Sequence, residues 1–554
     1  MVMARRTVGS TASAHNHNAA GIRTFCDNAE NSSNKVNISC LPEYKDYTYN
    51  EKQDIWALVS LKAPFQEEKE NEEKRAPIDI IAVIDKSGSM AGAKLDLVKR
   101  TLEFVLTQLN ERDRFSVVTY DTNVYIDFGL RVMTADNKKD ALHKIKNIQS
   151  GSCTNLCGGL LKGLCQIIDR PSDQKNEVAS VLLFTDGLAN SGITSPAGIV
   201  AAMKDPKRYD GPSSGAETRI QQQQMQQAPH RSWLNIIKHK RNATTSNQTQ
   251  AEVTALPTTS TSSKEAQASV YTFGFGSDHD PEMLKEISDA GNGMYYFIED
   301  IDQIAECFGH CLGGLLSTVA QGIQLEIVTE DGVTVKDVHT SRPFENTVNK
   351  SVKINMGDLQ SEENRDIVLE LTIESVHAPY DTTPQALLMS RVDYFNVITN
   401  ELESDVERLT VLRPVKTNVH DKTSSNVVVN KERSRVKMTK AIDLSRQAAD
   451  IGDLITSRHI IDNEIEDLKM NRLAMNKDDE MYISSAAGYD NMVEDLNRCY
   501  TNLSDETTYL QKGKKTHLNM AQQHSAQRCS HIDSISYATS KKRRVKDDSS
   551  CFRP

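Results

Sequence analysis

Apolar runs spaced along residues 78–299 indicate strands that are buried inside a sheet. They are rich in β-branched and aromatic side chains and read IDIIAVI (78–84), VASVLLFT (178–185), VYTFGFG (270–276) and MYYFIE (294–299). Runs of this kind are typical of parallel strands whose two faces are both covered by helices. They predict the centre of an α/β domain.

Helical and hairpin patterns fill the intervals between these runs. After the first run, apolar residues recur at helical spacing at Leu95, Val98, Leu102, Val105, Leu106 and Leu109. Residues 114–120 and 124–130 predict an antiparallel hairpin, and Asp280 followed by Pro281 predicts the start of a helix. The alternation of strands and helices predicts a doubly wound, mostly parallel sheet over residues 76–318.

The rest of the chain divides by its hydrophobic period. Residues 36–62 and 319–415 alternate apolar and polar side chains, which predicts an antiparallel β-sandwich to which the first interval contributes strands. Residues 430–512 carry helical spacing. The polar ends are expected to be a disordered N-terminus over residues 1–35 and a disordered basic tail over residues 513–554.

A low-complexity insert over residues 205–267 interrupts the α/β pattern. It contains a glutamine run at 221–227 and a stretch rich in threonine and serine at 254–263. A loop of this length inside a compact domain argues against regular structure in it. The helix expected before it should run back along the sheet, so the insert should leave from the edge opposite the carboxyl ends of the strands.

Composition narrows the classes of partner and location. The chain has 554 residues, with 65 lysines and arginines against 76 aspartates and glutamates, a net charge of -11. This balance argues against general affinity for nucleic acid or for an anionic membrane. We find no signal peptide and no apolar window of membrane-spanning length, so a cytoplasmic location is expected. The basic cluster KKRRVK (541–546) predicts either a nuclear localisation patch or a solvated tail.

Oxygen-bearing side chains gather where the predicted strands end. Asp85, Ser87 and Ser89 follow the first buried run in the pattern D-x-S-x-S, Thr154 precedes a predicted helix, and Asp186 ends the second buried run. In α/β folds the carboxyl ends of the strands share one edge, where ligands bind. Oxygen ligands suit a small hard cation, so this set predicts a site for Mg²⁺ or Mn²⁺. The alternative is that these residues cap helices and shape turns.

The ordered set Asp85, Ser87, Ser89, Thr154 and Asp186 resembles the metal-ion-dependent adhesion site of the von Willebrand factor type A (vWA) domain, and the resemblance covers about residues 78–316. The family implies that Ser87 and Ser89 bind the metal directly and that Thr154 binds it directly or through water. It implies that Asp85 and Asp186 act mostly through water. A sixth position then stays open for an aspartate or glutamate of a protein partner.

The order of segments along the whole chain resembles that of a subgroup of vWA proteins. In this subgroup a vWA domain precedes a β-rich segment and a helical Vwaint region associated with Hint (intein-like) domains. The stretches that carry this likeness lie at 273–280, 295–300 and 311–317. Plant relatives in the group are RING-type ubiquitin ligases, but the ten cysteines here form no C-x-x-C pair, so ligase activity is not expected to carry over. The terminus Cys-Phe-Arg-Pro (551–554) is similar to the first residues of a Hint domain, although the match is equally compatible with coincidence.

Other candidate groups favour structural roles. Residues 277–280 contain serine, aspartate and histidine, but neighbours in sequence form no catalytic relay and a helix cap explains them. A second metal site could begin from residues on one side of a helix, namely Cys307, His310 and Cys311, yet core packing is the favoured interpretation. Packing is likewise favoured over redox sensitivity for Cys153 and Cys157.

The function expected from these residues is a non-enzymatic, metal-dependent protein-binding module on an intracellular scaffold. Walker A, H-E-x-x-H and G-x-S-x-G motifs are missing from the sequence. The expected partner is a protein that presents a carboxylate, with neither nucleic acid nor membrane. The alternative function is a substrate-recognition component of a ubiquitin-ligase or Hint-type processing system without its own catalytic domain. A third interpretation is a structural protein whose metal site is vestigial.

Overall fold

The structure of the protein is a computed structural model. It describes residues 34–65, 75–171, 173, 175–186, 188–209, 268–299, 303–347, 350–415, 425–530, 537–543 and 545, all within one compact unit. The expected disordered N-terminus, nearly all of the low-complexity insert and the Hint-like terminus therefore lie outside the described residues. Among the described residues the strands form three sheets.

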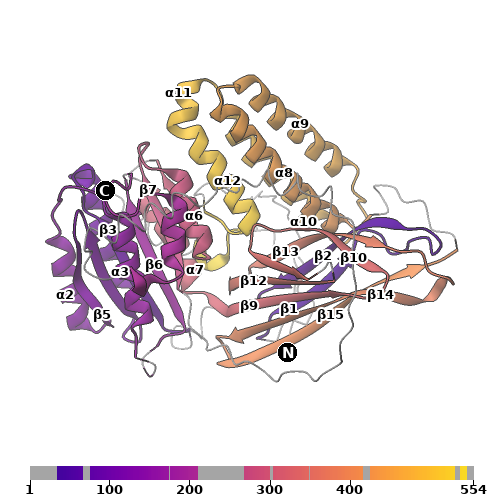
Figure 1. Cartoon of the computed structure of the whole chain (residues 1–554), viewed down its shortest axis with the longest axis horizontal. Coiled ribbons are helices and arrows are strands. Elements are labelled where there is room, and N and C mark those ends of the chain that lie inside the picture. Colours follow the sequence, from indigo (N-terminus) through magenta and orange to yellow (C-terminus); the bar gives the residue numbers. More distant parts are fainter. Residues whose placement is uncertain are drawn as a thin grey trace, which may run out of the picture. The chain divides into compact units, whose positions relative to one another are not determined.

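The first sheet has six strands in the order β5-β4-β3-β6-β7-β8 (Figure 1). The strands are β3 (Ile78–Asp85), β4 (Arg114–Tyr120), β5 (Val124–Val132), β6 (Val178–Thr185), β7 (Ser269–Phe275) and β8 (Tyr295–Ile298). Neighbours pair in parallel except β4 and β5, which form the antiparallel edge hairpin predicted from the sequence. The mostly parallel α/β sheet is confirmed.

Helices cover both faces of this sheet, which explains the unbroken apolar runs. They are α1 (Ala93–Gln108), α2 (Ala135–Lys146), α3 (Leu156–Ile168), α4 (Pro196–Met203), α6 (Pro281–Ala290) and α7 (Ile304–Leu315). From β3, Ile80 and Ile84 join a core with α1, α2 and α7, whereas Ile81 and Val83 join a core with α3, α4 and α6. Because successive side chains of a strand point to opposite faces, the central residues of such a strand, 80–84 in β3, are all apolar and fill both cores.

The insert leaves this domain on the side away from the carboxyl ends of the strands. The short 3-10 turn Pro206–Arg208 follows α4, and the described chain resumes at Ala268. Ser269, the first residue of β7, pairs with Ser180 near the beginning of β6. The chain therefore returns from the insert at the edge opposite the end of β6, as the sequence predicted.

Two antiparallel sheets form the sandwich. One has the order β1-β2-β13-β10 and the other β11-β12-β9-β14-β15. Their strands are β1 (Asn37–Pro42), β2 (Gln53–Lys62), β9 (Thr318–Thr329), β10 (Val333–His339), β11 (Phe344–Thr347), β12 (Ser351–Gln360), β13 (Asn364–Ile373), β14 (Tyr380–Asn396) and β15 (Glu401–Arg413). Alternate residues such as Ile55 of β2 and Leu325 of β9 share one buried core, and the opposite face of the first sheet contacts α8 through Leu58, Val368 and Val429.

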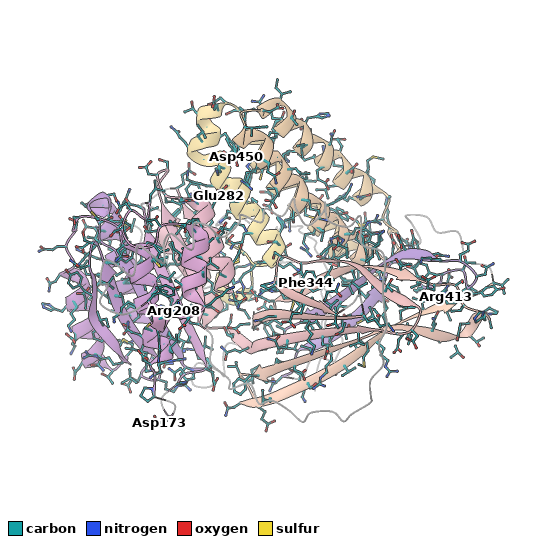
Figure 2. The ribbon with its side chains drawn as sticks, in the orientation of Figure 1. Asp173, Arg208, Glu282, Phe344, Arg413 and Asp450 are labelled. Atoms are coloured by element: carbon teal, nitrogen blue, oxygen red, sulfur yellow. The ribbon has the colours of Figure 1, made fainter. Side chains whose placement is uncertain are left out.

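A helical region follows the sandwich. It comprises α8 (Val427–Asp450), α9 (Leu454–Leu473), α10 (Tyr482–Thr501), α11 (Glu506–Thr508), a π-helical turn (Tyr509–Gly513) and α12 (Lys514–Ala526). Arg446 of α8 donates to Glu282 of α6 at 3.0 Å and to Asp450 at 2.8 Å, and Figure 2 labels both carboxylates. None of the described helices combines the length and the apolar composition that crossing a membrane requires.

The expectation of a disordered tail from residue 513 onward is wrong for α12. This helix is polar in sequence but buried, because its side chains find partners on distant elements. Gln522 accepts a hydrogen bond from the backbone N–H of Tyr295 at 2.8 Å, and Asn519 donates to the carbonyl of Tyr295 at 3.0 Å. These two side chains satisfy backbone groups of β8, which lies at the edge of the six-stranded sheet.

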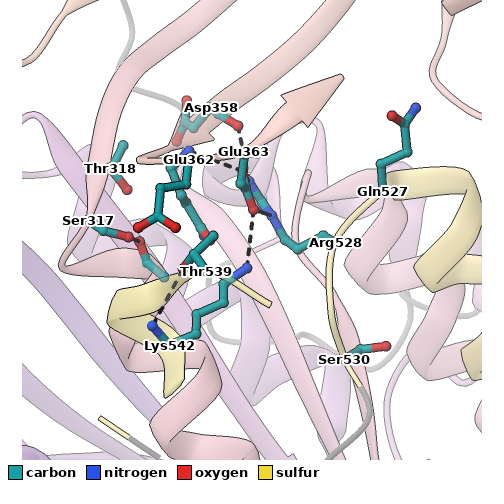
Figure 3. Close-up of polar contacts among 12 residues, drawn as sticks. Ser317, Thr318, Asp358, Glu362, Glu363, Gln527, Arg528, Ser530, Thr539 and Lys542 are labelled. Atoms are coloured by element: carbon teal, nitrogen blue, oxygen red, sulfur yellow. Dashed lines mark hydrogen bonds and ion pairs between the residues drawn. The ribbon is translucent and has the colours of Figure 1, made fainter. Parts of the chain in front are cut away.

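The described residues 527–530, 537–543 and 545, here called the C-terminal segment, are also ordered against the rest of the chain. Arg528 and Lys542 both point to Glu363, which lies between β12 and β13 (Figure 3). Lys542 is buried, so the basic cluster is not a uniformly solvated patch. Val545 belongs to the same buried core as Phe308 of α7. The segment therefore contributes to the α/β core as well as contacting the sandwich.

Glu464 of α9 carries a pH-dependent contribution to stability. Burial raises the pKa of this carboxyl from 4.5 to about 7; the Lys437 charge lowers it and the Asp467 charge raises it further. A carboxyl whose pKa rises on folding destabilises the folded state as the pH rises from its ordinary pKa to the raised pKa, because the unfolded chain releases its proton more readily. We expect Glu464→Gln to raise the free energy of unfolding by about 1–2 kcal/mol at pH 8.

The gain from Glu464→Gln should shrink as the pH falls through 7 and vanish near 4.5, where the carboxyl is protonated in both states. Urea denaturation at a series of pH values measures it. Glu466→Gln is the matched control, because Glu466 lies on the same helix with 70% of its side chain exposed. Equal effects of the two substitutions at pH 8 would contradict a raised pKa for Glu464 in the folded protein.

Candidate metal-ion site

The carboxylate of Asp85 is held by its own loop and by the neighbouring strand. Asp85 ends β3 and is fully buried. Its Oδ1 accepts a hydrogen bond from the N–H of Ser87 at 2.8 Å, and its Oδ2 accepts one from the hydroxyl of Thr185 at 2.7 Å. Burial raises the pKa of the Asp85 carboxyl, the bonds from Ser87 and Thr185 oppose this rise, and the charge on Asp186 adds to it.

The two hydroxyls of the D-x-S-x-S loop meet the carboxylate that ends β6. Ser87 Oγ lies 3.1 Å from Ser89 Oγ, and Ser89 Oγ donates to Asp186 Oδ1 at 2.9 Å. Mg²⁺ binds six oxygens at about 2.0–2.1 Å in an octahedron, so adjacent ligand oxygens lie about 2.9 Å apart. The separations of 3.1 Å and 2.9 Å are close to this value and are also ordinary hydrogen-bond lengths, so each of these two pairs of oxygens could serve as neighbouring ligands.

Thr154 lies in a second loop that is bonded to the first. The N–H of Gly88 donates to the carbonyl of Ser152 at 3.1 Å, which joins the two loops directly. Thr154 is buried, its N–H donates to the side chain of Asn190 at 2.8 Å, and its carbonyl accepts from the N–H of Asn190 at 3.2 Å. The structure thus brings Asp85, Ser87, Ser89 and Asp186 together through side chains and anchors Thr154 beside them through its backbone.

Two residues that position this site were not identified from the sequence. Asn190 fixes the Thr154 loop to the loop after β6, and Asn155 caps α3 by accepting from the N–H of Gly158 at 3.1 Å. Asn155 also faces Gly192, where a Cβ atom would lie 2.6 Å from its Oδ1 and where φ is +73°. An asparagine before a helix is a recognisable cap signal, whereas the contact made by Asn190 has no local signal.

Lys94 is a further charged member of the site that the sequence did not indicate. It lies in the first turn of α1, and its ammonium forms an ion pair with Asp186 Oδ2. The Lys94 side chain is 33% exposed, whereas that of Asp186 is fully buried. A lysine in the first turn of a helix is disfavoured by the helix dipole, so only the contact itself reveals its place here.

Of the candidate groups assigned structural roles, His279, Cys157, Cys307, His310 and Cys311 are buried. Cys153 is exposed, so the prediction that it packs in the core is wrong. Nε2 of His279 lies 2.6 Å from the hydroxyl of Tyr295, and burial lowers the pKa of this histidine to about 4. Cys307 and Cys311 belong to the core beneath α7, and Cys157 belongs to the core beneath α3. In the described part of the chain, no group of three or more histidine, cysteine, aspartate or glutamate side chains could hold a metal ion. A cation at the Asp85 loop would therefore depend on hydroxyl ligands.

Comparison with known proteins identifies the α/β domain. Residues 79–310 match the family model of the von Willebrand factor type A domain. Among solved structures, the chain is similar to a von Willebrand factor type A protein from Catenulispora acidiphila, with a TM-score of 0.55 at 14% identity, covering 85% of this chain and 91% of that chain. At this identity the likeness shows the fold alone.

Curated relatives match parts of the chain. It is 23% identical over 394 residues to the E3 ubiquitin-protein ligase WAV3 of Arabidopsis thaliana, covering 70% of this chain and 42% of that protein. It is 33% identical over 125 residues to the inter-alpha-trypsin inhibitor heavy chain H3 of Mus musculus, covering 22% of this chain and 14% of that protein. The chain thus spans less than half the length of these relatives.

Proposed function

Given that residues 79–310 form a von Willebrand factor type A domain, we propose that this chain is a protein-interaction module whose binding depends on a divalent metal ion. The observation that carries the proposal is the close approach of side-chain oxygens of Ser87, Ser89 and Asp186, which lie 3.1 Å and 2.9 Å apart in successive pairs. The likeness to the inter-alpha-trypsin inhibitor heavy chain H3, over 125 residues, supports an interaction role.

The residues present would hold the ion at the loop that follows β3. Ser87 and Ser89 offer neutral hydroxyl oxygens, and Asp85 and Asp186 supply the negative charge that attracts a cation. When bound, Mg²⁺ or Mn²⁺ supplies a positive centre that attracts a carboxylate of the partner protein. The hydrogen bonds from Ser87 and Thr185 orient Asp85, and the bond from Ser89 orients Asp186, so this chain arranges the oxygens before any ion arrives.

A calorimetric titration of the full chain with Mg²⁺ and with Mn²⁺ tests the proposal. We expect saturable binding by the wild type and loss of binding, by at least about 100-fold, when Asp85 and Asp186 are both replaced by alanine. Ser87→Ala/Ser89→Ala removes the hydroxyls and keeps both carboxylates, so it should weaken binding without changing the charge of the site.

The matched control for the carboxylate variant is Asp96→Ala/Asp136→Ala. These carboxylates belong to α1 and α2 of the same domain, and their side chains are 66% and 96% exposed. The control should bind like the wild type. Absence of binding by the wild type, in a chain whose thermal unfolding shows it to be folded, would overturn the proposal and favour the vestigial site.

A second candidate function is favoured by the extent of the match to WAV3. That match covers 70% of this chain, more than the α/β domain alone, and supports a role as the substrate-recognition part of a ubiquitin-ligase system. The related Hint-type alternative rests on residues 551–554, outside the described residues. Ubiquitylation with purified chain, ubiquitin, activating and conjugating enzymes, and no added ligase tests for its own activity. We expect no product, and a ubiquitin conjugate would show that the chain is an enzyme.

A further inference from the structure

Lys94 occupies an unusual place beside the oxygen set. Its ammonium contacts Asp186 Oδ2, while Asp186 Oδ1 accepts the hydrogen bond from Ser89. A Cβ atom on Gly276, which follows β7, would lie 3.9 Å from the Lys94 ammonium. The lysine side chain therefore lies over the carboxyl edge of the sheet, at the oxygens that a cation would use.

Helix stability does not account for this lysine. The N-terminal end of a helix carries partial positive charge, so a lysine in the first turn of α1 is unfavourable there. The neighbouring basic residue of the D-x-S-x-S loop, Lys86, is directed elsewhere, since its ammonium lies 4.0 Å from the centre of the Tyr125 ring. Among the described contacts of Asp186, Lys94 alone supplies a full positive charge.

The charge of the site depends on Lys94. Asp85 and Asp186 bring two negative charges and Lys94 brings one positive charge, which leaves a net charge of about -1. A divalent cation changes this sum to about +1, which attracts a carboxylate. Without Lys94 the same sum is about 0 after the ion binds, and the attraction to a carboxylate is largely lost.

We propose that Lys94 is a specificity-determining residue of this site, which competes with the divalent ion for Asp186 and keeps the loaded site positive toward a partner carboxylate. The inference rests on the proposed function. It assigns two opposite effects to one side chain: Lys94 weakens the binding of the metal ion and strengthens the binding of the carboxylate. An ion pair that served stability alone would produce neither effect on binding.

Mn²⁺ titration of the full chain tests the first effect. We expect Lys94→Gln to bind Mn²⁺ about tenfold more tightly than the wild type, because one positive charge near the ion is removed. Lys94→Arg keeps the charge and should bind within about threefold of the wild type. Lys99→Gln is the matched control. Lys99 lies on the same helix, but its ion-pair partner is Asp96, at 3.9 Å, and not Asp186. The loss of its charge should therefore leave the Mn²⁺ affinity unchanged.

Acetate, which presents a single carboxylate, tests the second effect. Added to Mn²⁺-loaded protein, it should displace metal-bound water and lower the proton relaxation rate of the solvent. We expect Lys94→Gln to need about five times more acetate than the wild type for half of this change. Lys94→Arg and Lys99→Gln should respond like the wild type.

The outcomes separate this inference from the function on which it rests. If neither the wild type nor any variant binds Mn²⁺, both the proposed function and the role of Lys94 are overturned. If Lys94→Gln binds Mn²⁺ no more tightly than the wild type does, the role of Lys94 is overturned and the metal site stands. Tighter Mn²⁺ binding with unchanged acetate response overturns the contribution to partner recognition. A thermal unfolding curve for each variant establishes that the compared proteins are folded.

Discussion

Replacing Glu363 by alanine is expected to lower the free energy of unfolding by about 3–5 kcal/mol, because it leaves a group of buried cations without their shared counter-ion. Arg528 donates to both carboxylate oxygens of Glu363 at 2.9 Å, Arg365 donates to Oε2 at 2.8 Å, and Lys542 donates to Oε1 at 3.2 Å. The side chains of all four are at most 4% exposed.

The electrostatics of Glu363 agree with a charged carboxylate at the centre of this group. Burial alone would raise its pKa, but the charges of Arg365, Arg528 and Lys542 outweigh burial and hold the pKa well below its ordinary value. The substitution is strongly destabilising because each cation loses a partner where water cannot replace it. The loss should be smaller for Glu363→Gln, which keeps a hydrogen-bond acceptor.

Urea denaturation of the full chain, followed by circular dichroism, measures this effect. Glu362→Ala is the matched control, because Glu362 is the preceding residue and its carboxylate accepts exposed bonds from Ser540 at 3.0–3.2 Å. The control should change stability by less than about 1 kcal/mol. A Glu363→Ala protein as stable as the control would show that the C-terminal segment is not held by this group.

Replacing Asp79 by alanine should destabilise the α/β domain by a similar amount, about 3–5 kcal/mol. Asp79 is fully buried near the start of β3, and its carboxylate accepts from Arg114 Nε at 2.8 Å and from Arg170 Nη1 at 2.5 Å. The side chain of Asn176 donates to Oδ1 at 2.8 Å. Without the carboxylate, two guanidinium groups that are less than 10% exposed lose their counter-ion.

Thermal and urea unfolding measure the effect of Asp79→Ala, with Asp140→Ala as the control. Asp140 belongs to the same domain and forms surface ion pairs with Arg131 and with Lys144, each at 3.6 Å, and its side chain is 42% exposed. The control should lose less than about 1 kcal/mol. Because Asp79 lies at the opposite edge of the sheet from Asp186, folded Asp79→Ala protein should still bind Mn²⁺ like the wild type. Parallel loss of metal binding would contradict this separation of roles.

The α/β sheet could be predicted from the sequence because the residues that indicate each strand are adjacent in the chain. Every position of residues 80–84 must be apolar when a strand faces two cores, and that demand is readable without knowledge of the partners. The candidate site was predictable for a related reason. Asp85 and Asp186 end buried parallel strands, and parallel strands bring their carboxyl ends to one edge.

Elements whose burial depends on distant partners were not predictable. β15 (Glu401–Arg413) was not named as a strand because most of its side chains are exposed, and several of these are charged, at the edge of its sheet. α12 was expected to be disordered because its buried side chains are polar and are satisfied only by partners such as Tyr295, far away in the sequence. The contact of Lys94 with Asp186 is similarly long-range.

Val545 has a consequence for how the protein is made. The family match of the α/β domain ends at residue 310, yet the core beneath α7 includes Val545. A nascent chain leaves the ribosome N-terminus first, so strands β3 to β8 emerge long before this valine. We expect an apolar face at α7 to stay open during most of synthesis, where chaperones that hold nascent chains can reach it. The α/β domain would then complete its folding only when the segment that contains Val545 packs against α7.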